Sequence, residues 1–173
     1  IPAYGEEFKI VSFEDKSMVV PLGELGEIAV FSPTNFKGYW NKPKETAETL
    51  IDGWVYTGDT SRFDEDGYIY WLGRKKEMIK VSGFSVFPDE VELLMRNHPA
   101  VAQCGVRGIP DPRKGEVVKA AVVLNPEFRG RMSSDELISW AKGNMSHYKV
   151  PQVIEIRNSL PTSGTGKTLR RLL

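Results

Sequence analysis

The sequence has little of several features that mark particular classes of protein. Its 173 residues include one cysteine, Cys104, and two histidines. A single cysteine cannot form a disulfide within the chain, and the apolar neighbours of Cys104 predict a buried, unreactive thiol. Such sparing use of cysteine is typical of a reducing compartment, so we expect a cytoplasmic protein.

An excess of charge of one sign is also missing, because 23 basic residues balance 23 acidic ones. Nucleic-acid binders usually carry a net basic face, so we expect no nucleic-acid partner and no polybasic membrane anchor. No apolar run approaches the ~20 residues that a transmembrane helix needs. The N-terminus carries no secretory signal, and it opens with Ile1 rather than Met, which is consistent with a piece of a longer protein.

The apolar residues that are present, 40% of the chain, suffice for a substantial core, and their pattern divides the chain in two. Residues 1–73 predict short strands separated by Pro and Gly, a helix that begins at Pro43 and a hairpin around residues 64–67. The remainder predicts a tight hairpin at Ser82–Gly83, a helix from Pro88, a central strand over Val117–Leu124 and a helix capped by Ser133. We therefore expect an α+β fold in two domains, 1–75 and 76–173.

A lysine-bearing loop near the C-terminus is the first candidate for chemistry. Residues 163–168 (Ser-Gly-Thr-Gly-Lys-Thr) resemble the end of a phosphate-binding P-loop, but that motif needs glycine at the position of Pro161 and a helix behind the lysine. The P-loop interpretation therefore fails. Small neighbours still expose Lys167, whose ammonium group could neutralise a reacting phosphate or carboxylate. An ordinary solvated lysine remains the alternative.

Two further segments contain candidate ligands for an anion or a sugar. Asp59 follows Gly58 at an expected strand end, where a carboxylate could accept ribose hydroxyls or simply cap a turn. A calcium loop over 62–67 is excluded, because Arg62 would stand at its first ligand position. Arg74 and Lys80 belong to a basic stretch that ends at Gly83. That stretch predicts either anion binding beside a glycine turn or a solvated run of charge.

Taken together and in order, these segments resemble the adenylate-forming superfamily, which contains acyl-CoA synthetases, luciferases and peptide-synthetase adenylation domains. The resemblance covers essentially the whole chain. It is greatest to fatty-acyl-CoA ligases, because of the amino acids at residues 35–43 and 80–84. The motifs that carry it are Tyr56–Asp59, Gly73–Glu77 with Ile79–Gly83, Pro88–Glu92, Tyr148–Pro151 and Leu160–Lys167.

The resemblance implies a role for each matching position. Asp59 and Arg74 would bind the ATP or AMP nucleotide, and Trp71 would lie near its adenosine. Lys167 would bridge phosphate and carboxylate during adenylation, and Lys76 would be the hinge between the two domains. Lys80, which lies on the expected hairpin at Ser82–Gly83, would act in catalysis. The residues expected to line the pantetheine tunnel of CoA are Ser82, Gly83 and Phe84.

The implied reaction joins a fatty acid to CoA through an acyl-adenylate, with ATP, CoA and Mg²⁺ required. The family's phosphate loop and most of its magnesium and acyl ligands would precede Ile1, so we expect this chain to be inactive alone. Ser85 stands where some synthetases have arginine, which leaves a nucleotide contact there in doubt. Alternatives are a luciferase-like or carrier-protein-loading enzyme, and a non-catalytic module that binds a nucleotide or a protein partner. Chain length of the acid and oligomeric state stay undetermined.

Overall fold

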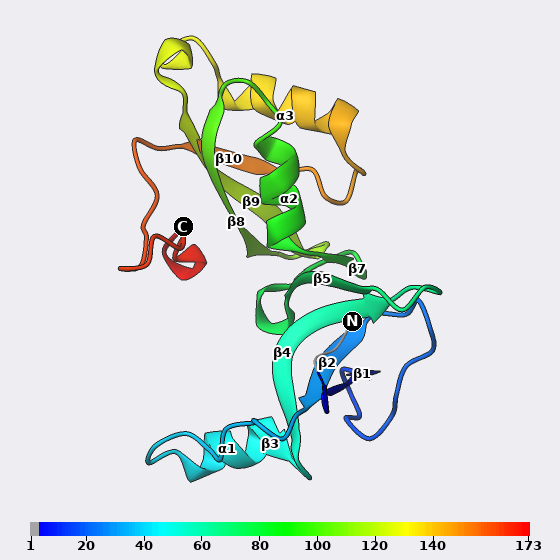
Figure 1. The fold of residues 1–173 in the computed structure, drawn as a ribbon. Helices are drawn as coiled ribbons and strands as arrows, with labels where there is room; N and C mark the ends of the chain where they lie inside the picture. The colour runs from blue at the N-terminus through cyan, green and yellow to red at the C-terminus, as the bar shows by residue number, and fades with distance from the viewer. Residues whose placement is uncertain (1–3) are drawn as a thin grey trace. The chain divides into compact units, whose positions relative to one another are not determined.

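The structure is a computed structural model that describes residues 4–173. The chain divides into two units, Ile1–Lys76 and Glu77–Leu173. Over residues 4–173, the first unit consists of a sheet and one α-helix, and the second consists of a sheet and two α-helices. Figure 1 shows the ribbon of both. The fold is therefore mixed α and β in both sequence halves, as expected. Among the described residues, no helix is long and apolar enough to cross a membrane.

The first unit is built on an antiparallel sheet in the order β1-β2-β4-β3, with β5 pairing to β4. The helix α1 begins at Pro43, whose missing N–H costs nothing in the first turn. A small core of Val11, Ala29 and Tyr56 lies on the sheet. The elements are β1 (Glu7–Val11), β2 (Gly26–Phe31), α1 (Pro43–Thr49), β3 (Leu50–Ile51), β4 (Trp54–Phe63) and β5 (Ile69–Arg74).

Strand β4 corrects one expectation, because Asp59 lies inside this strand and not at its end. Gly58 has φ of 73°, and the register between β2 and β4 shifts between Glu27 and Ala29. A second shift follows between Thr60 and Ser61, in the pairing with β5. The glycine therefore marks a bulge, which changes the direction of the chain without ending the strand.

The second unit contains a sheet in the order β10-β9-β6-β7, with β8 pairing to β9. Pairing is antiparallel except between β10 and β9. A short 3-10 helix over Lys75–Glu77 precedes the sheet. The elements are β6 (Ile79–Val81), β7 (Phe84–Val86), α2 (Pro88–Met95), β8 (Val101–Asp111), β9 (Gly115–Leu124), α3 (Ser134–Asn144) and β10 (Val153–Ile156), with 3-10 turns at Pro126–Phe128 and Arg170–Leu172.

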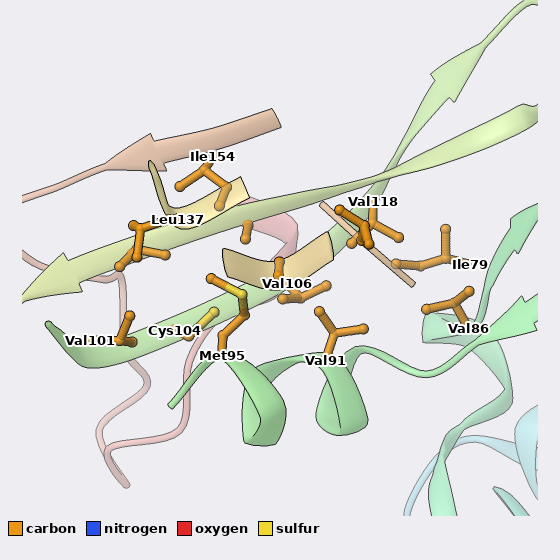
Figure 2. Packing of buried hydrophobic residues seen from close by; sticks show 14 of the residues in the cluster. Ile79, Val86, Val91, Met95, Val101, Cys104, Val106, Val118, Leu137 and Ile154 are labelled. Carbon is orange, nitrogen blue, oxygen red and sulfur yellow. The ribbon is translucent and has the colours of Figure 1, made fainter. Parts of the chain in front are cut away.

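Strand β9 is buried on both faces, which explains its almost continuous apolar run. Ala120 and Val122 join the main core, in which α2 and α3 cover one face of the sheet (Figure 2). The alternate residues Ala121 and Val123 pack with Leu160 and Leu173 in a smaller cluster. Because side chains alternate along a strand, the C-terminal segment covers the face that the helices leave open.

Candidate functional site

Asp59 and Arg74 lie opposite each other on β4 and β5. The Oδ1 atom of Asp59 is 2.9 Å from Nε of Arg74, an ion pair whose angles fall outside those of a hydrogen bond. The Arg74 side chain is 53% exposed and that of Asp59 is 23% exposed, so both remain accessible. Trp71 is exposed on the same strand as Arg74. A carboxylate, a guanidinium and an indole therefore occur on two neighbouring strands.

The backbone that carries Asp59 is held by β2. The buried carboxylate of Glu27 accepts a hydrogen bond from the N–H of Gly58, at 3.0 Å, and its other oxygen lies 3.6 Å from Nζ of Lys75. The Thr57 hydroxyl donates to the Ile28 carbonyl and accepts from the N–H of Asp59. These contacts fix the bulge, and Glu27 links it to the basic residues that end the unit.

A hollow of about 540 Å³ opens beside this bulge within the first unit. Four basic side chains and two glutamates occur on its walls, so its charge is mixed with a basic excess. Such a lining suits an anion that also offers hydrogen-bonding groups. The charged and aromatic residues on its walls are Lys16, Glu27, Tyr39, Glu48, Tyr56, Arg74, Lys75 and Lys76.

In the second unit, the β6–β7 hairpin brings together Lys80, Ser82, Gly83 and Phe84. Ser82 has φ of 49° and Gly83 has φ of 87°, the pair of positive values found in type I′ turns. The positive φ that the sequence indicated at Gly83 is therefore present. A Cβ added at Gly83 would meet nothing within 4 Å, so the glycine serves the backbone conformation and leaves open space beside it.

The hairpin's side chains are anchored at its base and exposed at its tip. The Lys80 ammonium group donates to the Ser85 hydroxyl at 2.9 Å, and the Lys80 N–H donates to Glu116. The Phe84 ring is 49% exposed and stacks on Tyr148, with ring centroids 4.5 Å apart. His147 meets both rings edge-on. Sequence reasoning gave no role to His147 or Tyr148, because only folding brings them to the hairpin.

Lys167 lies on a separate loop of the same unit and is exposed. The loop closes on itself: the Ser163 N–H donates to the Lys167 carbonyl at 2.8 Å, and Thr162 pairs with Thr168. Just beyond it, Arg170 is buried against Glu77, Asp89 and Glu92. The sequence offers one signal for Arg170, a cation close to the end of the given chain, and this signal predicts no particular role.

Lys76 is exposed and is the last residue of the first unit. Cys104 is buried, and this burial, followed by the charge of Glu92, raises the pKa of its thiol to about 12. The expected inert thiol is therefore present. Within residues 4–173, no group of three histidine, cysteine or carboxylate side chains is placed to hold a metal ion.

The expected site residues thus fall into three groups, each confined to one unit. Asp59, Trp71 and Arg74 lie on adjacent strands of the first unit. The Lys80–Phe84 hairpin and the Lys167 loop both belong to the second.

Comparison with known proteins identifies residues 90–167 with the family of the AMP-binding enzyme C-terminal domain. A feruloyl-CoA synthase of Amycolatopsis sp is 46% identical over 151 residues, which are 87% of this chain and 30% of that protein. A long-chain-fatty-acid–CoA ligase of Salmonella typhimurium is 40% identical over 173 residues, which are all of this chain and 30% of that protein. The chain thus spans about 30% of the length of the curated relatives it matches.

Among solved structures, the o-succinylbenzoate CoA synthetase of Bacillus subtilis aligns with a TM-score of 0.88 and 34% identity. The alignment covers 98% of this chain and 34% of the synthetase, which was solved with its acyl-adenylate intermediate and also with ATP and magnesium. The matching domain, the curated relatives and this shared fold agree with one another. Residues 90–167 thus form an AMP-binding enzyme C-terminal domain, and the chain as a whole is similar to the corresponding part of adenylate-forming CoA synthetases.

Proposed function

We propose that this chain is the C-terminal part of an AMP-forming acyl-CoA ligase. The observation that carries the proposal is the placement of two functional groups, Lys167 and the Ser82–Phe84 hairpin, on one unit that begins directly after Lys76. The exposed ammonium group of Lys167 suits the reaction of a carboxylate with the phosphate of ATP. The open turn at Gly83 suits the passage of the thiol-bearing arm of CoA. A rotation at Lys76 would move both groups together.

The first half-reaction is the attack of a carboxylate oxygen of the acid on the α-phosphorus of ATP. The bond from the α-phosphorus to the bridging oxygen breaks, and pyrophosphate leaves. Lys167 would place its ammonium group between the carboxylate and the phosphate, where it offsets their negative charge in the transition state. Asp59 would accept hydrogen bonds from the ribose hydroxyls, with Arg74 and Trp71 on the adjoining strand. Positioning supplies much of the rate here.

In the second half-reaction, the thiol of CoA loses its proton to solvent, and the sulfur attacks the acyl carbonyl carbon of the adenylate. A thioester forms, and AMP leaves with the electrons of the broken C–O bond. Ser82, Gly83 and Phe84 would line the path of the pantetheine arm, and Lys80 would hold the hairpin through Ser85. The open space at Gly83 supports this role, because a narrow chain could pass there without meeting a side chain.

The acid substrate is best proposed from the relatives, and the names of two of these relatives indicate different acids. Long-chain-fatty-acid–CoA ligases match over the whole chain, which favours a fatty acid. The feruloyl-CoA synthase has higher identity over fewer residues and supports an aromatic acid as the second candidate.

ATP and CoA are cytoplasmic metabolites, and the one buried thiol suits the same compartment, so we propose that the enzyme acts in the cytoplasm.

Replacing Lys167 tests the assignment of the two half-reactions. In the chain extended upstream to the length of its relatives, Lys167→Ala should slow adenylation about 100-fold or more, because a charge contact in the transition state is lost. Conversion of preformed acyl-adenylate with CoA should change less than threefold. The two rates are measured as pyrophosphate release and thioester formation. Lys142→Ala, an exposed lysine on α3, serves as the control. An equal loss in both half-reactions would count against this role of Lys167.

A further inference from the structure

Arg170 occupies the centre of an ionic cluster three residues after Lys167. Its Nη1 contacts Glu77, its Nη2 lies 2.6 Å from Asp89, and its Nε lies 2.8 Å from Glu92. The side chain is only 10% exposed, and all four residues belong to the second unit. A second bond, from Nη2 to Glu92, completes a forked contact of the kind that arginine alone provides.

The three carboxylates come from different parts of the unit. Glu77 is its first residue, while Asp89 and Glu92 lie three residues apart on one side of α2. Glu92 also accepts the N–H of Val106 at 2.9 Å, which ties the cluster to β8. Burial alone lowers the pKa of Arg170, but hydrogen bonds to Glu92 and Asp89 outweigh it and raise the pKa above its usual value. The guanidinium is therefore always charged.

The Lys167 loop is suspended between two fixed points. On one side, Leu160 is buried beside β9. On the other, Leu173 is buried in the same cluster, and its carbonyl accepts a hydrogen bond from Arg107 at 3.0 Å. The Leu169 N–H donates to the Pro161 carbonyl at 2.8 Å and closes the base of the loop. Arg170 directly follows this closure, so its contacts determine where the base lies.

We propose that Arg170 is a positioning residue for adenylation, which holds the backbone of Lys167 in fixed relation to the start of the second unit at Glu77. This inference rests on the function proposed above. Because Glu77 directly follows Lys76, any rotation there is transmitted through Arg170 to the lysine loop as well as through the sheet. We call the contacts of Arg170 with Glu77, Asp89 and Glu92 the clamp. Loss of the clamp leaves Lys167 chemically intact but displaced, and small displacements of a reacting group can cost about 100-fold in rate.

Three variants in the chain extended upstream test the proposal. Arg170→Met should lower the rate of adenylation about 100-fold and leave thioester formation from preformed adenylate within threefold. Arg170→Lys should restore part of the rate, because lysine keeps the charge but lacks the fork. Lys119→Met is the control, since it breaks the 2.9 Å ion pair with Glu155 between β9 and β10 and should affect neither step.

Amide hydrogen exchange on the 173-residue chain supplies a readout independent of activity. In Arg170→Met, the amides of Ser163, Gly166 and Leu169 should exchange at least tenfold faster, while those of Ala120 and Val122 in β9 stay protected. Glu77→Gln, which removes the ion pair between Arg170 and a partly exposed carboxylate, should give a smaller increase in exchange at the same amides. It covers the case in which Arg170→Met does not fold.

The proposal that Arg170 positions the lysine loop would be overturned by equal losses in both half-reactions, or by unchanged exchange in the lysine loop. Exchange that rises throughout the unit in both Arg170→Met and Glu77→Gln would also overturn it, because the cluster would then only stabilise the fold. If the unsubstituted enzyme forms no adenylate, the proposed function fails, and the exchange data still decide whether Arg170 orders the loop.

Discussion

At the scale of single residues, Glu27 shows how a buried charge is used to fix a backbone. It lies in β2 at 4% exposure, among apolar neighbours, where an unpaired carboxylate would be costly. Its two oxygens meet the Gly58 N–H and the Lys75 ammonium group. Asp59 follows directly on Gly58, so a distortion at Glu27 is passed to the carboxylate we propose for ribose binding.

Truncation of Glu27 should therefore destabilise the first unit. We expect Glu27→Ala to lower the free energy of unfolding by about 1–3 kcal/mol, because the Gly58 N–H and Lys75 lose their acceptor. Glu27→Gln should cost less, since the amide oxygen can still accept from Gly58. Urea unfolding followed through the amide signals of β2 and β4 measures both, with exposed Glu24→Ala as the control. A glutamine as costly as the alanine would contradict this explanation.

The candidate site residues could be named from the sequence, and the residues that support them in the fold could not. The positions of Asp59, Arg74 and the Lys80–Phe84 hairpin follow from motifs along the chain. Glu27 and Arg170 act through partners 31 and 78 positions away, respectively, in the Gly58 and Glu92 contacts. Sequence periodicity carries no information about such distant pairs. Only the tertiary fold shows that these two charges are buried and bonded.

At the scale of elements, local signals predicted the hairpin at Ser82–Gly83 and the helix α3 well, because turn glycines and capping boxes act over a few residues. Strand β8 extends to Asp111 and runs through Pro110, a residue that usually interrupts strands. Within the described residues its one ladder partner is β9, so a proline without an N–H is tolerated on this edge strand. The bulge at Gly58 could not be predicted from its neighbours in the sequence, because it depends on pairing with the distant strand β2.

The capping box of α3 gives the prediction for this scale. The Ser133 hydroxyl accepts from the Glu136 N–H, and the Glu136 carboxylate accepts from the Ser133 N–H and hydroxyl. Ser133→Ala should cost about 1 kcal/mol of stability of the second unit, measured by urea unfolding followed through the amides of α3. Exposed Ser139→Ala, inside the helix, should stay within about 0.5 kcal/mol of zero.

This contribution should also depend on pH. Hydrogen bonds from Ser133, the backbone one first, lower the pKa of Glu136 below its ordinary value of 4.5. A carboxylate with a lowered pKa stabilises the fold fully above its unfolded value, and the contribution is lost as the pH falls below about 4.5. The difference between the parent chain and Ser133→Ala should shrink over that range. A cost unchanged down to low pH would show that Glu136 takes no part.

At the scale of the whole molecule, the division after Lys76 separates the residues proposed to bind the nucleotide from the residues proposed to act in the two half-reactions. The nucleotide candidates Asp59, Trp71 and Arg74 belong to the first unit, and Lys167 belongs to the second unit together with the Ser82–Gly83 hairpin. We propose that Lys76 is the hinge about which these groups exchange. A cation placed for adenylation would oppose the departure of anionic AMP, which gives a physical reason for removing it before the thiol attacks.

The most direct test of this account compares two proteins for their products: the 173-residue chain and the same chain extended upstream to the length of its relatives. Each is given ATP, CoA and either a long-chain fatty acid or ferulate, and nucleotides and thioesters are measured by mass spectrometry. The account predicts acyl-CoA and AMP in equal amounts from the extended chain, with the fatty acid preferred, and neither product from the chain alone. Acyl-CoA from the chain alone, or ADP in place of AMP from the extended one, would contradict it.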